Sequence, residues 1–169
     1  MSPNDTSAWP GGRPRAPRAG DATLPAWPAR TVAVLSTAGE DVHAIPVSAP
    51  VRAGDRAILL SLHQSRDTLG RIRRRPQVAL TFLAEGDVAF TARGRATVVA
   101  EPMAADPQYH AVSIAVDQVD DHRQPEFRVT AGVDRQWADE AARAALAARV
   151  RALSNAPAQQ PETPARSTP

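Results

Sequence analysis

Short apolar runs, separated by turn residues at intervals of about eight to twelve positions, constrain the fold of this chain more than any other feature. Gly39, Gly54 and Gly86 stand in the turns between consecutive runs. Such spacing is typical of antiparallel strands joined by tight turns, so we predict a mostly β fold. The expected strands cover residues 31–37, 42–48, 56–62, 77–83, 88–100, 112–116 and 127–131.

Two segments interrupt the β pattern and predict helices. Residues 65–75 begin at a predicted N-cap, Ser65, place apolar side chains on one face and end before Pro76. This short helix lies between the third and fourth expected strands. From Asp134 the chain is rich in alanine, with Trp137 and Leu153 at helical spacing, which predicts a C-terminal amphipathic helix. Gly94, within a long strand, predicts a β-bulge.

The 169 residues suffice for one domain with its own core. Residues 1–28 are rich in Pro, Arg and Gly and lack periodicity, so we expect a disordered N-terminal arm. Residues 155–169 have a similar composition and predict a disordered C-terminal tail. The folded domain is therefore expected to cover residues 29–154.

Composition excludes several function classes. The chain has no cysteine, which rules out disulfides, thiolate nucleophiles and Cys-ligated metal centres. Its four histidines are scattered, so no metal site is predicted, and no side chain stands out as catalytic. A net charge of +2, without aromatics among the arginines, argues against nucleic acid as a partner. No apolar run approaches the roughly 20 residues of a membrane helix, and the N-terminus lacks a signal peptide, so we expect no membrane partner and a cytoplasmic location.

A proline in a strand and the start of the short helix are the strongest hints of a ligand site. Pro46 cannot donate to a ladder, so its strand must lie at an edge, at a bulge or against something other than a neighbour. The helix start offers free N–H groups, the hydroxyls of Ser65 and Thr68 and the guanidinium of Arg66, which together could hold a phosphate. The same residues also fit a helix that plugs a barrel end, with Ser65 as a cap and Arg66 in solvent.

The order and spacing of the elements from Leu24 to Pro102 resemble the pyridoxamine 5′-phosphate oxidase-like family of flavin-binding split barrels. The most specific parts of the resemblance are Ile45-Pro46-Val47 in the second strand and Ser65-Arg66 followed by Leu69, Ile72, Arg74 and Pro76. With this resemblance the predicted fold becomes a six- to seven-stranded antiparallel split β-barrel, with the short helix between strands 3 and 4 and the amphipathic helix at the C-terminus.

The resemblance implies a homodimer with flavin mononucleotide (FMN) at the subunit interface. The strand at 45–48 would lay its backbone along the flavin ring, the end of the third strand would line the ring or the ribityl chain, and the helix start would hold the phosphate. Thr68 stands where many relatives carry Lys or Arg, so a deazaflavin coenzyme, or less readily haem, stays open. The implied cofactor-binding residues are Ile45, Pro46, Val47, Ser48, Ser61, Leu62, His63, Ser65, Arg66, Thr68 and Leu69.

The predicted function is therefore an FMN- or deazaflavin-dependent oxidoreductase that acts on a small organic substrate. The first alternative is a non-catalytic split barrel that binds flavin or haem. A second alternative, from another class, is a small barrel used as an interaction module. The sequence leaves the substrate and the electron donor open.

Overall fold

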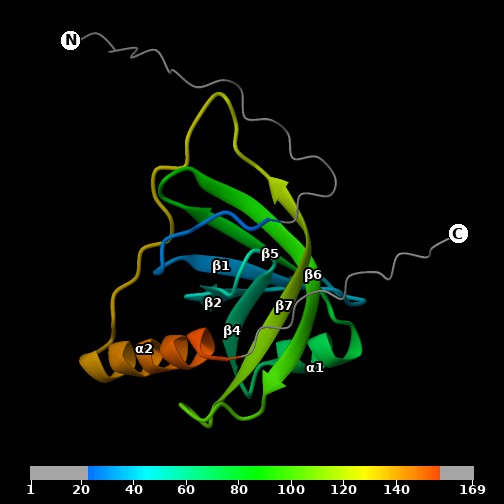
Figure 1. Ribbon diagram of the computed structural model, residues 1–169, viewed down its shortest axis with the longest axis vertical. Helices are drawn as coiled ribbons and strands as arrows, with labels where there is room; N and C mark the ends of the chain where they lie inside the picture. Colours follow the sequence, from blue (N-terminus) through cyan, green and yellow to red (C-terminus); the bar gives the residue numbers. More distant parts are fainter. Residues whose placement is uncertain (1–22, 157–169) are drawn as a thin grey trace, which may run out of the picture.

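The computed structural model describes residues 23–156, which fold into one curled antiparallel sheet and two helices (Figure 1). Within these residues the sheet has seven strands in the order β2-β1-β5-β6-β7-β4-β3. The predicted mostly β, antiparallel split barrel is confirmed. The elements are β1 (Val32–Thr37), β2 (His43–Ser48), β3 (Val51–Arg52), β4 (Ala57–His63), α1 (Asp67–Arg74), β5 (Gln77–Ala84), β6 (Val88–Ala100), β7 (Tyr109–Asp121) and α2 (Glu140–Ser154).

The main core fills the inside of the curled sheet. Phe82 of β5 is fully buried there, and its ring stacks on that of Phe90 with centroids 4.5 Å apart. One end is closed by α1, whose buried Leu69 and Ile72 join this core. Helix α1 therefore anchors the connection between β4 and β5 to the main core.

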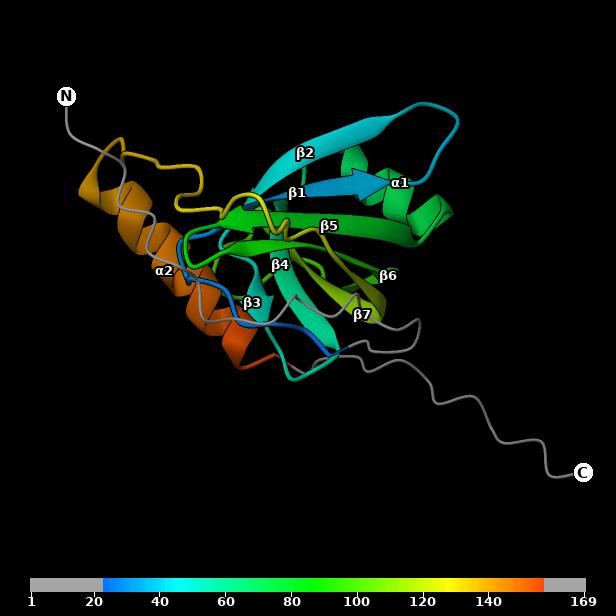
Figure 2. The same cartoon turned by 90° about the horizontal axis from the view of Figure 1, so that it is seen from above.

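Strand β4 is buried on both of its faces, which explains its unbroken apolar run. Ile58 and Leu60 point into the main core, while Leu59 belongs to a second cluster on the other face. Leu153 of α2, only 1% exposed, packs in that second cluster with Met103. Helix α2 thus lies against β3 and β4, outside the half-barrel (Figure 2).

Two local predictions about strands are confirmed. Strand β2 pairs with β1 alone and forms one edge of the sheet, so the missing N–H of Pro46 costs no ladder bond to a second neighbour. The ladder between β6 and β7 shifts register between Arg93 and Gly94, which is the predicted bulge. The two-residue strand β3, at the other edge, was not predicted.

Three predictions about elements were wrong. Residues 127–131 form no strand, because β5 and β6 beneath them are already paired on both sides; Val129 bonds instead to Asp87, by its carbonyl oxygen and by its N–H. Helix α2 begins after Asp139, not Asp134, since the Asp139 carboxylate accepts the N–H of Ala142 at 2.7 Å. Helix α1 has Arg66 as its N-cap, not Ser65, because the Ser65 hydroxyl is bonded to His63.

The predicted terminal arms lie mostly outside the described residues, which exclude 1–22 and 157–169. The described part of the first arm contacts the barrel. Leu24 is 2% exposed and its N–H donates to the carbonyl of Asp55, while the Trp27 ring packs against Phe82 at 4.5 Å between centroids. These residues cover the open side of the main core.

Candidate functional site

A cleft of about 140 Å³ lies between the edge strand β2 and the end of β4. Strands β2 and β4 are separated by most of the sheet in strand order, but they meet where the sheet curls. Residues of β7 and α2, which are distant in sequence, complete the walls. Most of the predicted cofactor-binding residues are brought together here. The lining residues are Ile45, Pro46, Val47, Ser48, Ser61, Leu62, His63, Arg66, Tyr109, Leu146 and Arg149.

Three predicted residues do not line this cleft. Thr68 is fully buried, and its hydroxyl lies 2.9 Å from Nε2 of His43. Leu69 is 2% exposed and belongs to the main core. Ser65 stands beside the cleft, where its hydroxyl lies 2.8 Å from Nδ1 of His63. Of the three, Ser65 is therefore the one that can act on the cleft, through His63.

Arg66 places a cation at the mouth of the cleft. It is the exposed N-cap of α1 and lines the cleft. The carboxylate of Asp67 is taken up by Arg71 at 2.7 Å, and this hydrogen bond holds the pKa of Asp67 below its usual value. Within the described residues Arg66 forms no ion pair with a carboxylate, so the mouth favours an anion.

Sequence reasoning missed Tyr109, Leu146 and Arg149. The Tyr109 ring meets His63 edge-on at 5.1 Å between centroids, and Cζ of Arg149 lies over the Tyr109 ring, 3.8 Å from its centroid. Arg149 also donates from Nη1 to the Asp106 carboxylate at 2.8 Å. No sequence pattern connects β7 and α2 with β2, because these contacts arise from tertiary packing alone.

The donor set of the cleft suits the phosphate end of a flavin nucleotide and one edge of its ring. The β2 backbone and the half-buried Ile45 offer an apolar wall, while Arg66 offers donors. The enclosed volume of about 140 Å³ is below the range of about 300–1,000 Å³ that is usual for ligand pockets. A bound flavin would therefore extend past the exposed rim at Pro46 and Ser48.

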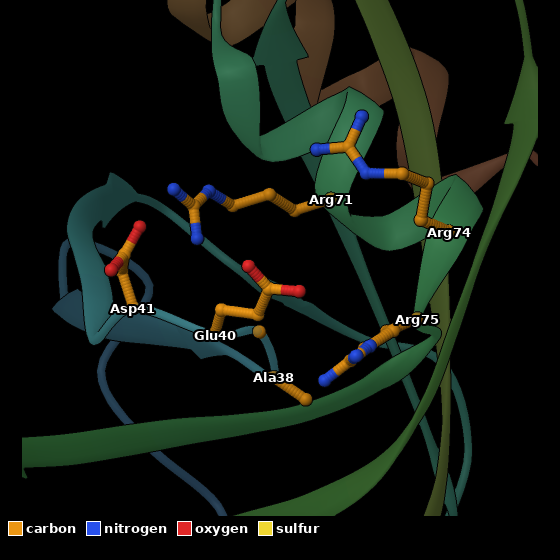
Figure 3. Close-up of a pocket in the computed structure, with 7 residues that line it drawn as sticks. Ala38, Glu40, Asp41, Arg71, Arg74 and Arg75 are labelled. Atoms are coloured by element: carbon orange, nitrogen blue, oxygen red, sulfur yellow. The ribbon is translucent and has the colours of Figure 1, made fainter.

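A second hollow, of about 290 Å³, lies between the β1–β2 hairpin and the end of α1 (Figure 3). Arg71 reaches toward Asp41, and the Glu40 carboxylate points between Arg71 and Arg75. The hollow mixes charges of both signs, and its wall contains none of the predicted site residues. We therefore place the candidate site at the cleft between β2 and β4.

The described residues hold neither a metal-binding cluster nor a membrane-spanning helix. Across residues 23–156, histidine and carboxylate side chains nowhere gather in a group of three or more that could bind a metal ion. No helix of this part is long and apolar enough to cross a membrane.

Comparison with known proteins finds likeness in structure. No protein family model matches the sequence, and no curated protein does. The fold is similar to that of a protein from Clostridium acetobutylicum related to general stress protein 26, of the pyridoxinephosphate oxidase family, at 13% identity and a TM-score of 0.48, over 58% of this chain and 85% of that one.

Two further solved structures are named for flavins. A FAD-binding protein from Mesorhizobium loti is 15% identical with a TM-score of 0.44, over 54% of this chain and 84% of its own. The flavin reductase PheA2 is 14% identical with a TM-score of 0.46, over 65% of this chain and 91% of its own. Proteins of the family that the sequence resembles are thus among the structural neighbours. At these identities and TM-scores the likeness carries no functional conclusion, so function has to be argued from the cleft.

Proposed function

We propose that the cleft between β2 and β4 binds a flavin nucleotide, FMN or a deazaflavin coenzyme, and that the chain is an oxidoreductase for a small organic substrate. The observation that carries this proposal is the convergence of the β2 backbone, the end of β4 and Arg66 on one cleft. A flavin site has to hold the flavin ring, the ribityl chain and the phosphate together. Here β2 supplies an apolar wall for the ring, the end of β4 supplies polar side chains for the ribityl chain, and Arg66 supplies a cation for the phosphate.

Each element has a distinct role in this proposal. The backbone of Ile45–Ser48 would hold the ring, the side chains of Ser61 and His63 would bind the ribityl chain, and Arg66 would bind the phosphate; all of these residues line the cleft. Ser65 holds the His63 ring through its hydroxyl at 2.8 Å. The bound flavin supplies hydride transfer to or from the substrate. The protein orients the two reactants and keeps water from the covered face.

The cleft opens beside a sheet face that suits a second copy of the chain. Val34 of β1 and Leu83 of β5 are 44% and 52% exposed on this face, and Pro46 stands opposite Val34 in the ladder. The outward residues of β2, Ala44, Pro46 and Ser48, are uncharged as well. Uncharged apolar surface of this kind is typical of interface centres. We therefore propose a homodimer in which the partner subunit covers the part of the flavin that extends past the rim.

The test is a flavin titration of the protein and of the double variant Ser65→Ala/Arg66→Ala. The variant is expected to bind FMN more than tenfold more weakly, which corresponds to about 1.4 kcal/mol, because the phosphate loses its cation. Affinities are measured from the quenching of flavin fluorescence, and the absorption spectrum of the loaded protein identifies the cofactor.

Arg75→Ala is the matched control, because Arg75 is an exposed cation at the other end of α1 and lines the second hollow. It should leave the FMN affinity within about twofold. An unchanged affinity in the double variant would show that the phosphate is held elsewhere. A wild-type protein that takes up neither FMN nor a deazaflavin would contradict the proposed function itself.

A further inference from the structure

Arg149 is the one lining residue of the cleft that carries a charge from α2. Its side chain is only 12% exposed, and it is held on two sides. Nη1 donates to Asp106 at 2.8 Å, and Cζ of the guanidinium lies over the Tyr109 ring, 3.8 Å from its centroid. The orientation of the guanidinium is therefore fixed before any ligand binds.

These contacts leave part of the guanidinium unused. The Nε atom is buried, and no acceptor in the described residues lies within hydrogen-bonding distance of it. A guanidinium has five N–H groups, and a single carboxylate, Asp106, faces this one. An anchor for α2 requires only the Asp106 and Tyr109 contacts, so anchoring explains the bonded part of the side chain and leaves Nε unexplained.

The charge of the cleft points the same way. Its lining contains two arginines, Arg66 from α1 and Arg149 from α2, and no carboxylate, because Asp106, which pairs with Arg149, stands outside the lining. Arginine suits carboxylate and phosphate groups because its planar fork donates two parallel hydrogen bonds. A guanidinium already aligned by a carboxylate and an aromatic ring loses little freedom when it binds such a group.

We propose that Arg149 is a ligand-binding residue of this cleft and that the ligand presents it with an oxyanion, a phosphate or a carboxylate. The proposal rests on the proposed function, since it assigns a second anion contact to the same cleft. The oxyanion has two possible sources. It is either the phosphate of the flavin nucleotide, shared with Arg66, or an anionic group of the organic substrate, which makes Arg149 a specificity-determining residue.

The first experiment compares FMN with riboflavin, which has the same ring and no phosphate. Both are titrated into wild-type protein, Arg149→Met and the control Arg151→Met, which removes an exposed cation from the same helix. If the flavin phosphate is the source, Arg149→Met weakens FMN binding more than tenfold and riboflavin binding less than twofold. Arg151→Met leaves both affinities within twofold. Thermal unfolding of each variant establishes that it is folded.

The second experiment needs no variant in its binding step. The Nε–H signal of Arg149 is followed by ¹⁵N NMR in the flavin-loaded wild-type protein, after assignment through its loss in Arg149→Met. If the substrate is the source, inorganic phosphate shifts this signal saturably, while the affinities for FMN and riboflavin do not depend on Arg149. This measurement shows whether Arg149 binds an oxyanion even where Arg149→Met fails to fold, because the signal is then assigned in Arg149→Lys.

Two results would overturn the proposal. An equal loss of FMN and riboflavin affinity in Arg149→Met would show that Arg149 only positions α2. Unchanged affinities together with an Nε–H signal that ignores inorganic phosphate would show that Arg149 binds no oxyanion. If wild-type protein binds no flavin at all, the proposed function fails, and the phosphate titration of the flavin-free protein still decides the role of Arg149.

Discussion

Gly94→Ala is expected to lower the free energy of unfolding by at least about 3 kcal/mol, although it adds only one methyl group. A Cβ atom at this position would lie 2.0 Å from the carbonyl oxygen of Ala115, which is a backbone atom and not the end of a flexible side chain. Strands β6 and β7 would have to separate at the bulge, where their register already shifts. Urea unfolding of the two proteins measures the difference in the free energy of unfolding.

Gly70→Ala is the matched control. Gly70 lies in α1, and the nearest atom to an added Cβ is the tip of the flexible Arg74 side chain at 3.3 Å. Because alanine favours a helix over glycine by up to about 1 kcal/mol, this variant should be as stable as the wild type or slightly more stable. If Gly94→Ala unfolded at the same urea concentration as Gly70→Ala, the close approach of β6 and β7 would be refuted.

Features set by the chemistry of one residue were predictable from the sequence. Pro46 lacks an N–H, which restricts it to an edge, and β2 is an edge strand. Gly94 lacks a Cβ, which permits the close approach at a bulge, and the bulge is there. The end of β4 and the start of α1 adjoin in sequence, so the proximity of His63 to Arg66 also followed from local order.

Features decided by competition between possible partners were not predictable. The alternation of Phe127, Val129 and Ala131 suits a strand, but the nearby strands β5 and β6 are already paired on both sides. Ser65 suits an N-cap, but His63 takes its hydroxyl. The role of Arg149 could not be predicted either, because nothing in the sequence of α2 indicates that this helix packs beside β4 and reaches the cleft.

Leu153→Ala is expected to release α2 from the barrel. Leu153 is 1% exposed and packs in the second cluster with Leu59 and Met103, whereas the α2 residues from Glu140 to Ala145 are exposed. Truncation of a buried leucine costs about 2–5 kcal/mol. A 15-residue helix is only marginally stable in water without packing, so the loss of this anchor should melt α2 before the barrel unfolds.

Hydrogen exchange followed by mass spectrometry tests this expectation directly. In Leu153→Ala the amides of residues 140–154 should exchange at least about tenfold faster, while those of β5 and β6 stay protected, because local opening requires less free energy than global unfolding. Arg151→Ala, a change at an exposed site of the same helix, should leave the exchange of α2 unchanged. Since Arg149 lies one turn before Leu153, release of α2 withdraws a cation and one wall from the cleft. Flavin binding that persisted unchanged in a Leu153→Ala protein with a melted α2 would place the ligand on the β2 and β4 side alone.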